Sequence, residues 1–149
     1  MIKQEFVIAA EAAAKGSPYP VGIAVAQAAL ESAWGSSQLS LKANNYFGIK
    51  AHGDADSIEL PTTEVVNGKT VKVLVRFAAY PTIAACFADR DRIITQLACY
   101  QDARANAASP EIFARCLARH WATDPKYAEK LLKIYRDNSL EELATIRNQ

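Results

Sequence analysis

Hydrophobic and small residues fill the stretch from Val21 to Trp34 with almost no interruption. A helix that is apolar on every side belongs inside a core, so this stretch predicts a central buried helix. Its two strongly polar residues, Gln27 and Glu31, are four positions apart and therefore lie on one helix face. Gly35 follows Trp34, and glycine commonly ends a helix, so we expect Glu31 close to the C-terminal end.

Apolar residues at helical spacing predict further helices before and after this one. In the segment after residue 82, Ile83, Phe87, Ile94 and Leu97 share one face. The Ser-Pro and Asp-Pro pairs further on predict two helix starts, because proline suits the first turn. The expected additional helices are Ile2–Lys15, Ser37–Lys42, Thr82–Tyr100, Pro110–Ala118 and Asp124–Tyr135.

An alternating pattern on both sides of Asn67-Gly68, a pair typical of a two-residue turn, predicts one β-hairpin. Such a turn pairs Glu64 with Val71 and directs the carboxylate to the apolar face. A longer turn would shift the register and place Glu64 in water, and the spacing favours neither. The expected strands are Thr62–Val66 and Lys69–Phe77, after a polar loop over 52–61.

Composition narrows the class of protein. The 149 residues are most simply one domain, and half of them are hydrophobic, enough for a folded core. The formal net charge of +1 gives no indication of a nucleic-acid partner. No apolar run reaches the roughly 18 residues of a membrane span, and Glu5 and Glu11 interrupt the N-terminal apolar stretch. We expect a single domain over 1–149 and no membrane insertion. We also expect no signal peptide in this chain, so export would follow another route, or a signal was removed earlier.

Cysteine and histidine placement gives no metal site. Three cysteines leave at least one unpaired. Cys86 and Cys99 fall on one predicted helix, too far apart for a disulfide, whereas Cys116 could meet either of them. Without a Cys-x-x-Cys pair, and with His52 and His120 isolated, a zinc site is not expected. We expect three buried thiols, no metal and no cofactor.

The position of Glu31 predicts an unusual carboxyl group. Apolar surroundings and the negative end of a helix both disfavour its charged form and raise its pKa, as a general acid near neutral pH requires. The alternative is that Glu31 lies on an exposed stripe or supports a loop by hydrogen bonding.

Three motifs stand out in the chain. They comprise Gln27, Ala28, Glu31, Ser32, Trp34 and Gly35, then Asn45, Phe47, Gly48, Ile49 and Lys50, then Trp121–Ala128. In this order they resemble the glucosaminidase family of bacterial peptidoglycan hydrolases (glycoside hydrolase family 73), which includes flagellar rod-associated hydrolases and autolysin domains. A hairpin motif that varies more among relatives is also similar, and it comprises Thr62, Glu64, Asn67 and Gly68. Ala33 stands where the family often has glycine.

The resemblance implies a fold and a set of site residues. The fold would be α+β and mainly α, lysozyme-like, with a helical lobe and a hairpin lobe flanking a cleft. Glu31 would be the catalytic acid, Glu64 the second carboxylate and Tyr127 an assisting residue. The competitors of Glu64 are Glu59 and, more weakly, Asp54 and Asp56. The expected substrate-binding residues are Asn45, Tyr46, Phe47, Trp121 and Asp124. The alternative for the three aromatic residues is a place in the core, and the alternative for Asp124 is that it caps a helix.

The implied activity is that of an endo-β-N-acetylglucosaminidase, which hydrolyses the β-1,4 bond after N-acetylglucosamine in peptidoglycan. Either Glu64 activates water, or the substrate's N-acetyl oxygen attacks with help from Tyr127. A muramidase or lytic transglycosylase on the same scaffold, and a non-catalytic peptidoglycan-binding module, are the alternatives. The expected partner is the glycan strand of peptidoglycan, and the family implies a flagellar or secretion assembly as a further partner. We expect the protein to act as a monomer, in the periplasm or in the extracellular wall.

Overall fold

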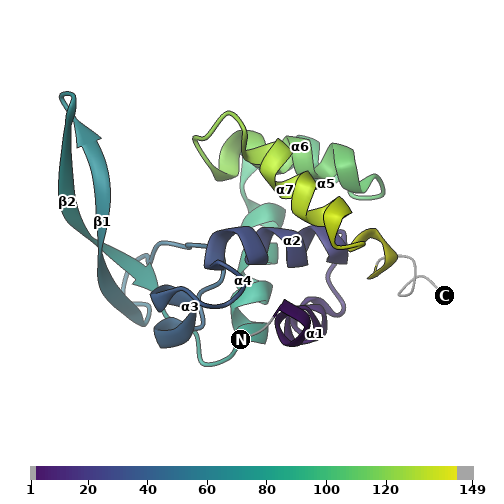
Figure 1. Ribbon diagram of the computed structural model, residues 1–149, viewed down its shortest axis with the longest axis horizontal. Coiled ribbons are helices and arrows are strands. Elements are labelled where there is room, and N and C mark those ends of the chain that lie inside the picture. The colour runs from purple at the N-terminus through teal and green to yellow at the C-terminus, as the bar shows by residue number, and fades with distance from the viewer. Residues whose placement is uncertain (1–2, 144–149) are drawn as a thin grey trace.

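The computed structural model describes residues 3–143 and is mainly helical, with one two-stranded antiparallel sheet. The hairpin stands apart from the helices, which gather around α2 (Figure 1). The elements in chain order are α1 (Lys3–Ala14), α2 (Val21–Ser32), α3 (Gln38–Ala43), β1 (Ser57–Val66), β2 (Lys69–Ala78), α4 (Ile83–Gln96), a 3-10 turn η1 (Ala98–Tyr100), α5 (Gln101–Ala105), α6 (Pro110–Trp121) and α7 (Tyr127–Asp137).

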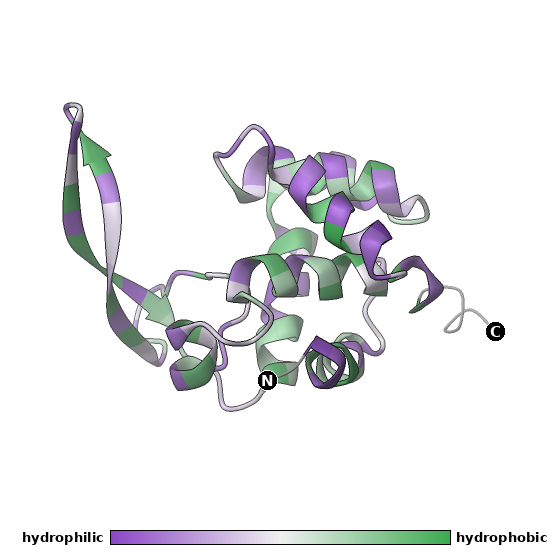
Figure 2. Cartoon of the chain, viewed as in Figure 1, coloured by the Kyte–Doolittle hydropathy of each residue, from purple (hydrophilic) through white to green (hydrophobic). Residues whose placement is uncertain are grey.

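Helix α2 forms the centre of the helical lobe, as its composition predicts. Every residue from Val21 to Ala29 is buried, and α1, α6 and α7 pack against it. Colouring by hydropathy shows an apolar α2 among helices with polar outer surfaces (Figure 2). Gly22 allows the segment after α7 to approach α2 closely, because a Cβ there would lie 2.3 Å from the backbone oxygen of Leu140.

The C-terminal end of α2 lies two residues earlier than expected. Ala33, Trp34 and Gly35 all have left-handed backbone conformations, with φ of 50°, 59° and 80°, so the helix ends at Ser32 rather than Trp34. The Ser32 hydroxyl donates to the Ala28 carbonyl and accepts from the Gly35 amide, which satisfies polar groups that the helix end leaves open. Glu31 is consequently the penultimate helical residue.

The helix expected over Thr82–Tyr100 is confirmed as far as Gln96, and the expectation is wrong from Leu97 onward. The helix ends at Gln96, because Leu97 is extended, and η1 and α5 follow. Arg104 donates to the carbonyls of Ile94 and Leu97 at 2.7 and 2.8 Å and so stabilises the break. Cys99 is exposed as a result, which corrects the expectation of three buried thiols.

The boundaries of the last two helices also differ from expectation. Helix α6 continues past Ala118 to Trp121, and α7 begins at Tyr127 rather than Asp124. Asp124 accepts from the amide of Lys126 at 2.9 Å, so it caps the turn that precedes α7.

The hairpin has the register that a two-residue turn requires. Glu64 pairs with Val71, and Asn67 and Gly68 have φ of 52° and 77°, as such a turn demands. The first strand already begins at Ser57, so the second half of the expected 52–61 loop is wrong. Within the described part of the chain, no helix is long and apolar enough to cross a membrane.

Candidate active site

Glu31 lies half-buried at the end of α2, beside Tyr127 of α7 and Gly48 of the loop after α3. Burial raises the pKa of the Glu31 carboxyl, and the Tyr127 hydroxyl lowers it by a smaller amount. The fold thus holds a carboxyl group whose protonated form persists to higher pH than usual. This is the property that the sequence predicts for Glu31.

Tyr127 supplies the nearest polar group to that carboxyl. Its side chain is 4% exposed, and its hydroxyl makes no hydrogen bond of ordinary geometry within the described structure. Burial raises the pKa of Tyr127, and the neighbouring Glu31 charge raises it further, so the phenol stays protonated and able to donate.

Arg90 is a residue of this site that our sequence analysis missed. It projects from α4, is completely buried, and donates from Nε to Oε1 of Gln27 at 2.8 Å. The sequence did contain a signal, because Arg90 lies three residues after Phe87 and four before Ile94, on the face that those residues predict to be buried. A charge at such a position needs partners, and Gln27 and Asp91 provide them.

Asn45 holds the loop that reaches Glu31. Its Nδ2 donates to the carbonyls of Ile49 and Ala78 at 2.8 and 2.9 Å, and its Oδ1 accepts from the amides of Phe47 and Ile49. The side chain is 1% exposed. The expectation that it binds substrate is therefore corrected, because its polar atoms are bonded within the protein.

Tyr46 and Phe47 are likewise core residues rather than sugar platforms. Their side chains are 7% and 1% exposed, and both rings pack against Phe87. Neither ring presents a face to a ligand, which corrects the expectation that they stack on sugar.

Trp121 is the aromatic residue of the predicted set that remains available to a ligand. It is partly buried, its indole N–H donates to the Phe47 carbonyl at 3.4 Å, and it lines a cavity of about 670 Å³ that Gly48 also lines. The same cavity is lined by Lys50, His52, Arg92, Tyr100 and His120, among others. Gly48 therefore connects the Glu31 carboxyl with a sizeable hollow in the surface.

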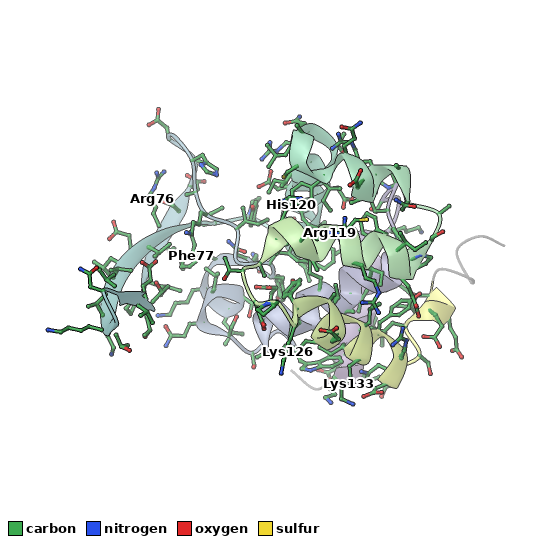
Figure 3. All side chains as sticks on the ribbon, turned by 90° about the horizontal axis from the view of Figure 1, so that it is seen from above. Arg76, Phe77, Arg119, His120, Lys126 and Lys133 are labelled. Carbon is green, nitrogen blue, oxygen red and sulfur yellow. The ribbon has the colours of Figure 1, made fainter. Side chains whose placement is uncertain are left out.

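Residues from both lobes line this cavity. His120 comes from the end of α6 and Ala78 from the end of β2, and Figure 3 labels His120 and Phe77, the hairpin residue before Ala78. The base of the hairpin is fixed to the loop of Gly48, because Ala78 N donates to the Ile49 carbonyl at 3.0 Å. The two lobes thus meet beside Glu31.

The structure keeps Glu64 separate from this group. The side chain is exposed on the hairpin and makes no hydrogen bond or ion pair within the described residues. It shares the face of Val71 and Val73, whereas its competitor Glu59 lies on the opposite face and pairs with Arg76.

Asp124 is bonded within its own loop. In addition to the Lys126 amide it accepts from Lys130 at 2.6 Å, and this bond is the largest cause of its lowered pKa. Residues 3–143 contain no group of three His, Cys, Asp or Glu side chains that could hold a metal ion.

Comparison with known proteins agrees with this geometry. The chain matches the family model Glucosaminidase, described as mannosyl-glycoprotein endo-beta-N-acetylglucosaminidase, over residues 7–140. It is 40% identical over 119 residues to Peptidoglycan hydrolase FlgJ of Pseudomonas aeruginosa, covering 75% of this chain and 30% of that protein. It is 36% identical over 129 residues to Probable N-acetylmuramidase of Lactococcus lactis, covering 82% of this chain and 29% of that protein. The chain therefore spans about a third of the length of these relatives.

A solved structure extends the similarity to three dimensions. The catalytic domain of the autolysin Auto from Listeria monocytogenes has a TM-score of 0.81 at 28% identity, covering 95% of this chain and 86% of that one. The expected lysozyme-like α+β fold is confirmed. Because the family model covers most of its length, this chain belongs to the glucosaminidase family.

Proposed function

We propose that this protein hydrolyses the β-1,4 bond that follows N-acetylglucosamine in peptidoglycan, with Glu31 as the general acid. The observation that supports this most is the carboxyl group itself, which is half-buried, raised in pKa and adjacent to Gly48, one of the residues that line the cavity. A glycosidase needs a protonated carboxylic acid beside the leaving oxygen, and burial provides one.

In the first step Glu31 donates its proton to the glycosidic oxygen as the bond to the anomeric carbon breaks. Positive charge then develops on the sugar ring and must be stabilised. The leaving sugar departs as a neutral alcohol, and Glu31 is left as a carboxylate, which the donating hydroxyl of Tyr127 stabilises.

Two routes complete the reaction, and they differ in the configuration of the product. In one route Glu64, on the hairpin, activates a water molecule that attacks the sugar, and the product has inverted configuration. Alternatively the substrate's N-acetyl oxygen attacks, with Tyr127 beside the intermediate, and configuration is retained. The exposure of Glu64 supports the first route, because water can reach the carboxylate. The closeness of Tyr127 to Glu31 supports the second route.

The glycan strand would enter the cavity that Gly48 lines. Its volume of about 670 Å³ and the presence of the partly exposed Trp121 suit a sugar ring, whose apolar face packs on aromatic side chains. We propose peptidoglycan strands as the partner, a monomer as the working form, and the periplasm or the extracellular wall as the place of action. We also propose a flagellar or secretion assembly as a further partner.

A muramidase is the second candidate, because one relative is named a probable N-acetylmuramidase at 36% identity. The two activities cut different bonds of the same strand and leave different ends. Purified peptidoglycan should be digested and the released ends reduced and identified by mass spectrometry. Reducing N-acetylglucosamine supports the proposal, whereas reducing or anhydro N-acetylmuramic acid would contradict it.

The same experiment covers the non-catalytic alternative. A binding module would sediment with the wall yet release no new ends, and Glu31→Gln would bind as the wild type does. An enzyme instead releases ends in the wild type and fails to do so in Glu31→Gln.

A further inference from the structure

Four side chains from three helices form a polar cluster at and beneath the Glu31 carboxyl. Gln27 and Glu31 come from α2, Arg90 from α4 and Tyr127 from the first residue of α7. Gln27 and Arg90 are 0% exposed and Tyr127 is 4% exposed. Arg90 and Gln27 belong to the part of this cluster that the reaction itself does not use.

The contacts of Arg90 argue for a purpose beyond packing. Nε donates to Gln27 at 2.8 Å, Nη1 donates to Asp91 at 3.0 Å, and the guanidinium carbon lies 5.5 Å from the centre of the Phe47 ring. A buried guanidinium is costly, and a well-packed apolar residue often serves stability equally well or better. Arg90 contacts Gln27, and Gln27 in turn lies beside Tyr127, the neighbour of Glu31. This placement of a buried charge so close to the catalytic pair is the feature that needs explaining.

A guanidinium donates hydrogen bonds and never accepts them, so it fixes the direction of every bond that follows. The buried Nε2 of Gln27 and the buried hydroxyl of Tyr127 have no hydrogen-bond partner in the described structure, and Tyr127 lies beside both Gln27 and Glu31. Because Oε1 of Gln27 already accepts from Arg90, a chain of bonds through this cluster can run in one direction only, with Gln27 donating to Tyr127 and Tyr127 donating to Glu31.

We propose that Arg90 and Gln27 are positioning residues that set the direction of a hydrogen-bond chain, so that Tyr127 donates to one oxygen of Glu31 and the acidic proton occupies the other. The chain is a property of the protein alone. Its consequence for turnover rests on the function proposed above, because the proton must face the glycosidic oxygen to be transferred.

The electrostatics of the cluster have the signs that this direction requires. The Tyr127 hydroxyl lowers the pKa of Glu31, and the Gln27 amide lowers the pKa of Tyr127. The other titratable groups that act on Arg90 are Asp91 on α4 and Tyr19 before α2, and Arg90 in turn acts on Cys86 and Tyr100. In the described structure Oη of Tyr127, Nε2 of Gln27 and Nη2 of Arg90 have no hydrogen-bond partner, and hydrogen bonds in enzyme sites often tighten when substrate binds.

Gln27→Glu tests the direction while keeping the shape of the side chain. The new carboxylate still accepts from Arg90 but has no N–H, so Tyr127 turns its proton away from Glu31. Loss of that bond and the added negative charge both raise the pKa of Glu31. Carbon-13 NMR of the glutamate carboxyls should show a pKa higher by about one unit or more, and kcat should fall about tenfold.

Two further variants keep the test decisive. Gln4→Glu makes the same chemical change on an exposed position of α1 and should alter neither the Glu31 pKa nor kcat. Gln27→Met combined with Arg90→Met removes both partners together, which folded proteins tolerate better than one unpaired buried charge. We expect this double variant to unfold at a similar denaturant concentration, with a raised Glu31 pKa and about a tenfold loss in kcat.

Near-ultraviolet circular dichroism should first show that Gln27→Glu and the double variant are folded. The proposal would be overturned if both variants then had the pKa of Glu31 and the kcat of the wild type. If the wild type releases no glycan ends, the proposed function fails. The NMR titration of Glu31 still decides whether the hydrogen-bond chain has the stated direction.

Discussion

A Cβ atom at position 48 would lie 3.5 Å from Oε2 of Glu31, so the carboxyl faces the bare backbone of Gly48. Gly48 has φ of 69°, a left-handed conformation that glycine adopts without penalty. The loop that carries it is bonded to Trp121 on one side and, through Asn45, to the hairpin base on the other. The surroundings of Glu31 therefore depend on a loop whose own position is fixed by both lobes.

Gly48→Ala should impair catalysis more than folding. We expect a stability loss of about 1 kcal/mol from the left-handed conformation. The added methyl group desolvates Glu31 further and raises its pKa, so the high-pH limb of kcat/KM should move upward while kcat falls. Urea unfolding measures the loss of stability, and a pH series of initial rates measures the shift of the limb. An unchanged high-pH limb would contradict the claim that Gly48 influences the pKa of Glu31.

Asn45→Ala should destabilise the protein by about 3 kcal/mol, because it leaves several buried backbone groups without partners. Asn106→Ala is the matched control, since Asn106 is part-exposed and its side chain donates one hydrogen bond, to the Asp102 carbonyl at 2.8 Å. We expect it to cost less than about 1 kcal/mol. Equal losses in the two variants, measured by urea unfolding, would refute the role of Asn45 as the residue that holds the loop.

Glu64→Gln distinguishes the two routes of the reaction. If Glu64 activates water, kcat should fall about 10²–10⁴-fold with little change in stability, because the side chain is exposed. Glu59→Gln, on the opposite face of the same strand, should leave the rate unchanged. Proton NMR of the first product anomer adds an independent result: an inverted product together with a normal rate for Glu64→Gln would exclude both routes as stated.

Local patterns predicted much of this architecture. The central helix follows from an uninterrupted apolar stretch, and the Glu64–Val71 pairing follows from Asn67-Gly68, because both signals act over a few residues. The break at Leu97 had no such signal. The residues around it suit a helix, and the bonds that stabilise the break come from the side chain of Arg104, which follows the break and whose type does not predict them.

The functional group of residues was predictable only in part. Glu31 and Tyr127 belong to motifs that sequence displays, and the structure brings them together. Asn45 belongs to a motif as well, yet its amide serves the backbone, and residue type does not distinguish that from substrate binding. Arg90 was missed because the partner that makes its burial tolerable, Gln27, lies 63 positions away in the chain.

Glu31→Gln should stabilise the protein in a pH-dependent way. The folded pKa of Glu31 lies above its unfolded value of about 4.5, so burial favours the neutral form. Below that value wild type and variant should be equally stable, and as pH rises through the folded pKa the wild type alone loses stability. By about pH 7 the variant should be ahead by on the order of 1 kcal/mol. Urea unfolding across pH, with exposed Glu5→Gln as control, measures this, and a variant less stable than the wild type at neutral pH would be inconsistent with it.

The turnover rate of Glu31→Gln on purified peptidoglycan tests the general-acid assignment most directly. Gln retains the size of the side chain and cannot donate an acidic proton, so the rate of release of reducing ends should fall about 10²–10⁴-fold while wall binding persists. A rate within a few-fold of the wild type, in protein shown to be folded, would contradict the role of Glu31 and with it the proposed mechanism.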